Sequence, residues 1–167
     1  MYRTIDDFLR NWEHEFKATE RVFGALTDKS LAQAIAAGHR TLGRIAWHIV
    51  TTVPEMMNRT GLKIAGPGTD VPMPSGIATI KNGYSQVGAS LVEQIKANWK
   101  DASLLIEDEM YGEKWSRGIT LSALLMHQAH HRGEMFVLMR QAGIQPPGIY
   151  GPVMEEWAQY GMPAPEV

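Results

Sequence analysis

The chain contains no cysteine among its 167 residues, and this absence excludes several classes of chemistry. Disulfide bonds, thiolate metal sites and cysteine nucleophiles all need a sulfhydryl group. Any bound metal ion must therefore be held by histidine, aspartate or glutamate. A reaction that uses a thiol would have to receive that thiol from a second substrate.

Long apolar runs and an excess of basic residues are missing as well. No stretch is apolar enough to predict a transmembrane helix, and the N-terminal sequence MYRTIDDFLRNWEHEF is acidic and amphipathic, unlike a signal peptide. Lys and Arg number 16 against 18 Asp and Glu, and the resulting net charge of −2 disfavours a broad phosphate-binding surface. We therefore expect a cytoplasmic protein that binds neither membranes nor nucleic acid.

Apolar residues recur at spacings of three, four and seven in four long segments, as they do in amphipathic helices. One helix is predicted over about residues 4–26, and a second from about Arg40 either ends or kinks near Pro54 or runs on to Arg59. Two more are predicted over about residues 79–109 and 119–143. Strand signals are nearly absent. The length suits a single domain, residues 1–167, and four such helices predict an all-α four-helix bundle.

Two segments lack this periodicity. Residues 61–78 contain four Gly and three Pro, which predicts a loop. This loop is long enough to cross the bundle, so the second and third helices need not be antiparallel neighbours. The tail, residues 144–167, is rich in aromatic residues and proline, and we expect one short helical turn around Glu155–Tyr160 to pack on the bundle.

Three of the six histidines lie in the sequence HQAHHRGEM, residues 127–135. On an α-helix His127 and His131 lie about 40° apart. Leu124 and further apolar residues share their side of the helix, so both histidines are predicted to point into the bundle. His130 lies near the edge of that face, which favours a supporting role.

Two inward histidines one helical turn apart can hold one divalent metal ion, but two ligands rarely suffice. His48 is the best candidate for a third ligand, because Ile45, Thr52 and Met56 share its side of the second helix. Three neutral imidazoles leave a coordination position open for water or substrate, as in catalytic zinc sites. The alternative is that these histidines are hydrogen-bonded core residues or line a pocket.

Neighbouring residues are candidates for supporting roles. Glu134 falls on the metal-facing side, where a carboxylate can accept a hydrogen bond from a ligand, bind weakly as a fourth ligand or act as a general base. The alternative for Glu134 is a partly exposed carboxylate paired with Arg or Lys. Glu55 and Trp47 are candidates for the pocket lining, and His130 for a hydrogen bond to a carboxylate that orients a ligand. Arg132 faces away from the predicted centre, which predicts a contact between helices or at a dimer interface.

Three stretches of the chain carry a resemblance, and they read RTLGRIAWHIV, SALLMHQAHHRGEMFVLMRQAGIQPP and YGPVMEEWAQYGM. In residues, order and spacing they resemble the DinB/YfiT-like superfamily of metalloenzymes, and more closely its DinB branch. The resemblance covers nearly the whole chain and implies an up-down-down-up four-helix bundle, often a homodimer. It also implies Ni²⁺ or Zn²⁺ held by His48, His127 and His131. Position 134 is commonly Gln in the family and is Glu in this chain.

The leading hypothesis is a metal-dependent enzyme of the thiol transferase or hydrolase type. A metal ion in an open three-histidine site would lower the pKa of bound water or of a small thiol. The deprotonated water or thiol would then be a nucleophile at neutral pH. The resemblance implies a low-molecular-weight thiol as one substrate, because some relatives are thiol transferases or thiol-dependent isomerases. The alternative is a non-catalytic stress-response protein that binds a metal or small ligand. A DNA-binding regulator is disfavoured by the charge and by the lack of a basic recognition helix.

Overall fold

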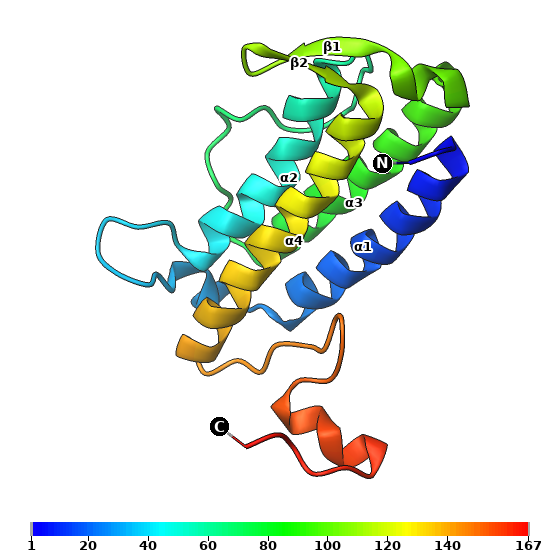
Figure 1. The fold of residues 1–167 in the computed structure, drawn as a ribbon. Coiled ribbons are helices and arrows are strands. Elements are labelled where there is room, and N and C mark those ends of the chain that lie inside the picture. The colour runs from blue at the N-terminus through cyan, green and yellow to red at the C-terminus, as the bar shows by residue number, and fades with distance from the viewer. Residues whose placement is uncertain (1, 167) are drawn as a thin grey trace.

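The computed structural model describes residues 2–166 and consists of four long helices with three short 3-10 helices and a β-hairpin (Figure 1). The elements in chain order are α1 (Ile5–Ala25), η1 (Asp28–Ala32), α2 (Leu42–Asn58), α3 (Ile77–Asn98), η2 (Asp101–Leu105), β1 (Glu107–Met110), β2 (Glu113–Ser116), α4 (Arg117–Gln141) and η3 (Met154–Tyr160). The long helices surround one hydrophobic core. The predicted helical bundle is therefore confirmed, and the hairpin is an addition to it.

The helices follow the up-down-down-up order. Both α1 and α2 pack against α3 and α4. The start of each of α1 and α3 lies at the end of the other, because the Ile5 amide donates to Asp101 and the Ile77 amide donates to Asp28, at 2.8 Å each. Helices α2 and α3 are thus parallel, and residues 59–76 run back along the bundle to join them (Figure 1).

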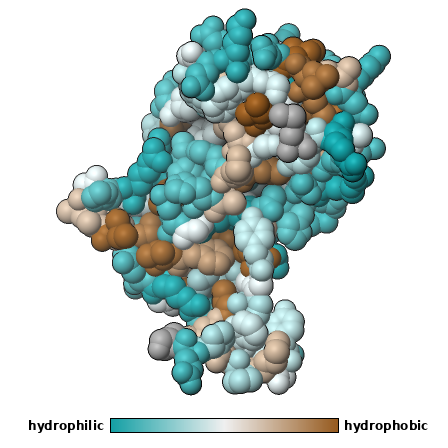
Figure 2. All heavy atoms as spheres, in the orientation of Figure 1, coloured by the Kyte–Doolittle hydropathy of each residue, from teal (hydrophilic) through white to brown (hydrophobic). Residues whose placement is uncertain are grey.

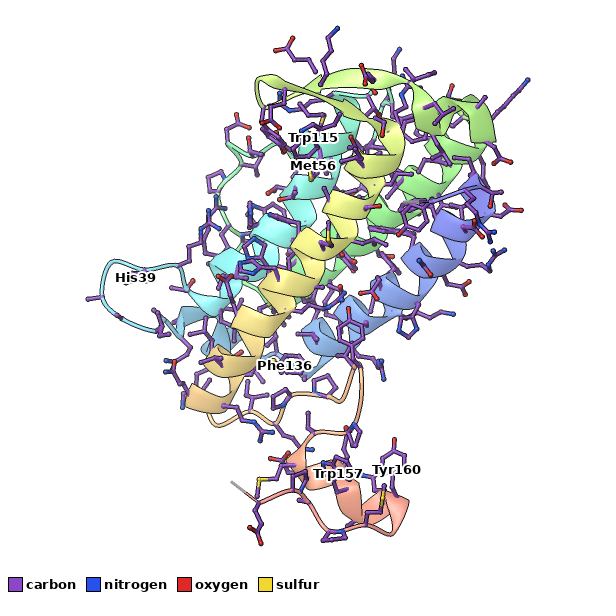
Figure 3. All side chains as sticks on the ribbon, viewed as in Figure 1. His39, Met56, Trp115, Phe136, Trp157 and Tyr160 are labelled. Atoms are coloured by element: carbon purple, nitrogen blue, oxygen red, sulfur yellow. The ribbon has the colours of Figure 1, made fainter. Side chains whose placement is uncertain are left out.

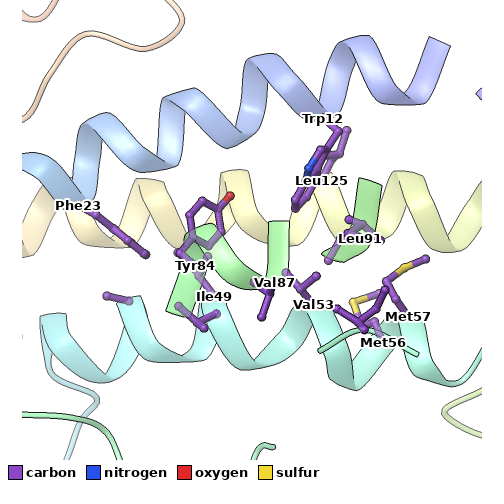
Figure 4. Packing of buried hydrophobic residues seen from close by; sticks show 14 of the residues in the cluster. Trp12, Phe23, Ile49, Val53, Met56, Met57, Tyr84, Val87, Leu91 and Leu125 are labelled. Atoms are coloured by element: carbon purple, nitrogen blue, oxygen red, sulfur yellow. The ribbon is translucent and has the colours of Figure 1, made fainter. Parts of the chain in front are cut away.

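The core is built from the apolar faces of all four long helices. The rings of Trp12, Phe23 and Tyr84 pack with the aliphatic side chains of Ile49 and Val53 (Figure 4). Burial of each such side chain stabilises the fold by roughly 1.5–3 kcal/mol. None of the helices within residues 2–166 is both long and apolar enough to cross a membrane.

Helix α2 is the central element and is buried on most of its sides. It begins where the Thr41 hydroxyl accepts a hydrogen bond from the Arg44 amide. It continues through Pro54 to Asn58, so the longer of the two predicted alternatives is correct. Pro54 removes one backbone donor, but its ring is buried beside Gly66 of the crossing loop, and this packing offsets the loss.

The prediction for residues 99–118 was wrong in two respects. Helix α3 ends at Asn98, well before residue 109, and β1 pairs antiparallel with β2 where we expected almost no strand. The two-residue turn uses Tyr111 and Gly112, both with positive φ, as a tight hairpin requires. Helix α4 begins at Arg117, two residues earlier than predicted, because the Ser116 hydroxyl caps it there.

The tail leaves the end of α4 at Gly143, which has the positive φ of a helix C-terminus. Its short helix η3 contains the predicted turn, and Trp157 and Tyr160 lie on it beyond the end of the bundle (Figure 3). An ion pair between Arg140 and Glu155 ties η3 to α4, but no η3 residue is buried. The contact with the bundle is therefore looser than the expected packing.

Two glycines of the long helices differ in their surroundings and carry opposite predictions. A Cβ on Gly88 of α3 would lie 2.1 Å from the Phe16 ring of α1, whereas a Cβ on Gly133 of α4 would meet no atom within 4 Å. Gly133 therefore does not mark a close approach of another helix within residues 2–166. Gly88→Ala should lower the free energy of unfolding by about 1–3 kcal/mol through overpacking. Gly133→Ala should raise it by about 0.5–1 kcal/mol through helix propensity. Urea denaturation measures both changes in the free energy of unfolding. If the two substitutions changed it in the same direction, the described spacing of α1 and α3 would be contradicted.

Candidate metal centre

Two neighbouring helices bring together the three histidines that the sequence indicated. His48 lies near the middle of α2, and His127 and His131 lie on successive turns of α4. Helices α2 and α4 pack against each other. One ring nitrogen from each histidine lies within 4.8 Å of the other two, so the cluster could hold a metal ion.

The rings are turned so that the same type of atom faces the centre. The Nε2 atom of His127 lies 3.1 Å from the Nε2 of His48 and 3.1 Å from the Nε2 of His131. The ring planes meet at 67° to 82°, so the imidazoles converge edge to edge rather than stack. One hydrogen bond would be enough to satisfy a ring nitrogen of a core histidine. The approach of two other imidazole nitrogens to the His127 Nε2 atom is not needed for that.

Electrostatics favour the form that binds metals. Burial, followed by unfavourable electrostatic interactions with His131 and other neighbours, lowers the pKa of both His48 and His127 to about 4. Both imidazoles are therefore neutral at pH 7. A neutral imidazole has one ring N–H, so the His127 Nε2 can donate to one of its neighbours at most. A central cation would accept all three nitrogen lone pairs at once. The three imidazoles therefore fit a metal ion as a set of ligands.

Two of the three rings are oriented by hydrogen bonds on the far side from the centre. The His131 Nδ1 lies 2.6 Å from the Glu134 carboxylate, which makes the ring a donor there and leaves its Nε2 lone pair pointing inward. The His48 Nδ1 lies 3.4 Å from the Thr52 hydroxyl, which itself donates to the His48 carbonyl at 2.7 Å. The His127 Nδ1 is buried without a partner among residues 2–166. The orientation of His127 therefore depends on what its Nε2 atom binds.

Glu134 bridges two histidines of α4. One carboxylate oxygen accepts from His131, and the other lies 3.4 Å from the His130 Nε2. Partial burial opposes its ionisation, but the hydrogen bond from His131 and favourable electrostatic interactions with His131 and His130 lower its pKa below the ordinary value. This geometry favours the acceptor role among the three that we considered for Glu134. His130 is 66% exposed and contacts that same carboxylate, as its expected supporting role requires.

The remaining pocket candidates, Trp47 and Glu55, form their hydrogen bonds with other residues. The Trp47 indole donates to the Val71 carbonyl at 3.0 Å, and its ring packs beside Gly83 of α3. Its contacts are therefore with the crossing loop and α3. Glu55 binds Arg59 at 3.0 Å and accepts from the Tyr111 hydroxyl at 2.6 Å. It thus joins α2 to the hairpin.

Sequence reasoning missed two residues near the centre. The sequence pattern indicates only that Thr52 shares the inward face of its helix, although its position four residues after His48 also brings the two side chains together. Arg40 precedes α2, and its positive charge contributes to the lowered pKa of His48 and of Glu134. No sequence motif marks Arg40, because its place depends on how the loop before α2 folds.

A buried polar network lies on the side of α4 that faces α1. The Arg132 guanidinium donates to the backbone carbonyl and carboxylate of Glu15, to the Thr19 hydroxyl and to the Tyr150 hydroxyl. Arg132 is only 2% exposed. The predicted contact between helices is confirmed at this position, and the network also ties the tail to the bundle through Tyr150.

Comparisons with known proteins identify the family and the fold. The sequence matches the DinB family over residues 1–166. It is 42% identical over 167 residues to the uncharacterized protein YrdA of Bacillus subtilis (strain 168), covering 100% of both chains. A crystal structure of a DinB-like protein from Bacillus cereus ATCC 10987 is 46% identical, with a TM-score of 0.87 over 90% of this chain and 100% of that one.

A second crystal structure shares the fold alone. The DinB-like protein YjoA of Bacillus subtilis is 14% identical, with a TM-score of 0.67 over 88% of this chain and 99% of that one. The family match spans almost the entire sequence, and the relatives at 42% and 46% identity align over most or all of their length. The chain, with a histidine triad that could hold a metal ion, belongs to the DinB family.

Proposed function

We propose that the chain is a metal-dependent enzyme of the thiol transferase or hydrolase type. The observation that carries this proposal is the convergence of the Nε2 atoms of His48, His127 and His131. Three protein ligands leave at least one coordination position free, which is characteristic of catalytic rather than structural sites. Zn²⁺ or Ni²⁺ suits an all-imidazole donor set.

The chemistry divides between the ion and the chain. A bound Zn²⁺ or Ni²⁺ supplies a Lewis acid that lowers the pKa of water or of a thiol in the open position. Glu134 holds the His131 ring in place by accepting its Nδ1 proton, and Thr52 does the same for His48 at a longer distance. Since the chain has no cysteine, a low-molecular-weight thiol would enter as a substrate. We further propose that the protein acts as a cytoplasmic homodimer.

The proposal is tested by turnover with and without metal. The purified protein is loaded with Zn²⁺ or Ni²⁺ and assayed with small thiols and an electrophile, and separately with esters and amides. Turnover that disappears on chelation and returns on reloading supports the enzyme. If the protein binds metal stoichiometrically but turns over none of these substrates, the proposal is contradicted. The alternative would then be favoured, a non-catalytic stress-response protein that binds a metal or small ligand.

Glu134 gives a graded prediction for metal affinity. Glu134→Ala removes the acceptor of the His131 Nδ1 proton and should weaken zinc binding by about 10–100-fold. Glu134→Gln keeps an oxygen acceptor but loses the charge, so its loss should be smaller, about tenfold at most. A competition titration against a chromophoric chelator measures both variants. Equal affinity of all three proteins would show that Glu134 does not orient a ligand.

A further inference from the structure

A cavity of about 490 Å³ lies between the start of α2, the last turns of α4 and the loop that precedes α2. This volume lies within the usual range for small-molecule sites. Hydrophobic side chains gather beside that loop on the surface (Figure 2), and those lining the cavity are Ile35, Ile45, Val137 and Leu138. Ile35 and Val137 are at least half exposed, so the apolar wall is open to an incoming ligand.

The cavity adjoins the histidine centre along the groove between α2 and α4. Glu134 lines the cavity and also accepts the hydrogen bond from His131. Ile45 precedes His48 by three residues on α2, which places the two side chains one helical turn apart on the same face. A ligand that fills the cavity therefore ends about one turn, roughly 5 Å, from His48 and His131.

One guanidinium in this cavity has no partner. Arg40 lines it and forms no ion pair or side-chain hydrogen bond with any of residues 2–166. Glu134 does not neutralise it directly, because the Glu134 oxygens face His131 and His130. A guanidinium beside an apolar wall is suited to a carboxylate on an apolar body.

We propose that this cavity binds the substrate of the proposed enzyme, and that the substrate is a small monocarboxylate with an apolar body. Its carboxylate pairs with Arg40, its body lies on Val137 and Ile45, and its reacting end reaches the histidine centre. A monoanion is favoured over a phosphate dianion because the Glu134 carboxylate lines the same cavity. The assignment of the ligand as a substrate rests on the proposed function, whereas the binding site itself does not.

The experiment uses 3-phenylpropionate as the probe, titrated into ¹⁵N-labelled protein that has been stripped with a chelator. Stripping prevents direct binding of the carboxylate to a metal ion. Amide shifts should be largest at Ile45, Val137 and Leu138. Arg40→Gln should raise the Kd by about tenfold or more, because a hydrogen-bonded ion pair is lost. Arg21→Gln, which removes the same charge from an exposed site on α1, should leave the Kd within about twofold.

Two further probes test the chemistry of the ligand. The neutral 3-phenylpropionamide should bind at least about tenfold more weakly than the acid, since it cannot form the ion pair. Equal binding of acid and amide, equal effects of the two arginine variants, or tighter binding of phenyl phosphate would each overturn the proposal. Arg40→Gln should still bind zinc stoichiometrically, because Arg40 is not one of the three ligands. If the wild-type protein failed to bind zinc, the proposed function would be contradicted. The titration of the metal-free protein would still test the binding site independently.

Discussion

Replacing His127 with alanine should weaken zinc binding by at least about a hundredfold, because the loss of a ligand costs more than the loss of its hydrogen-bond partner. His127 is the best choice among the three ligands. Its Nε2 atom is 3.1 Å from each of the other two, and its Nδ1 atom has no hydrogen-bond partner in residues 2–166. Its truncation therefore breaks no other hydrogen bond there. Isothermal titration with Zn²⁺ gives the affinity, and circular dichroism of the metal-free protein confirms that the variant folds.

His130→Ala is the matched control on the same helix. His130 is mostly exposed, lies 3.4 Å from the Glu134 carboxylate and meets the His131 ring edge-on. Because it is not one of the three converging ligands, its loss should change zinc affinity by less than about fivefold. Single alanine variants at His48 and His131 should behave like His127→Ala. If His130→Ala and His127→Ala lost equal zinc affinity, the ion would have to bind on a different face of α4 from the one proposed.

Replacing Arg132 with alanine should lower the free energy of unfolding by about 3–5 kcal/mol, because the Glu15 carboxylate would be left partly buried without its ion-pair partner. The Arg132 side chain is 3% exposed and that of Glu15 is 15% exposed, so water cannot fully replace the lost contacts. The same guanidinium also satisfies the Glu15 carbonyl and the Thr19 hydroxyl. Urea denaturation monitored by tryptophan fluorescence measures the change.

Arg140→Ala provides the comparison at the surface. Arg140 also pairs with a glutamate, Glu155, but both side chains are more than a third exposed. Its loss should cost less than about 1 kcal/mol. In a double variant, Glu15→Gln should recover part of the stability that Arg132→Ala loses, since the unpaired charge is removed. Similar costs for Arg132→Ala and Arg140→Ala would show that the buried network contributes no more than a surface pair.

Helices and the histidine cluster were predictable because both follow from the helical period. The spacing of His127 and His131 places both on one face of any regular helix, and neighbouring apolar residues identify that face as the inner one. His48 was identified by the same test on another helix. Its partnership with the α4 pair needed one more condition, that α2 and α4 pack against each other, and the bundle meets it.

The features that sequence reasoning missed depend on contacts rather than on period. Strands β1 and β2 are four residues each, too short for an alternating pattern, and the turn places the non-glycine Tyr111 at positive φ. Trp47 was a reasonable pocket candidate beside His48, but the adjacent position on a helix points about 100° away, towards the crossing loop. The exposed position of Gly133 and that of Arg40 depend on how other segments fold around α4 and α2.

The most direct measurement of the central claim is an anomalous-diffraction map from crystals of the zinc-loaded protein, recorded on both sides of the zinc absorption edge. The account predicts one strong anomalous peak between α2 and α4, about 2.0–2.1 Å from the Nε2 atoms of His48, His127 and His131. That peak should be absent from crystals of His127→Ala grown in the same way. A peak held instead by His130 and Glu134, or no ordered zinc in crystals of the wild-type protein, would contradict the account.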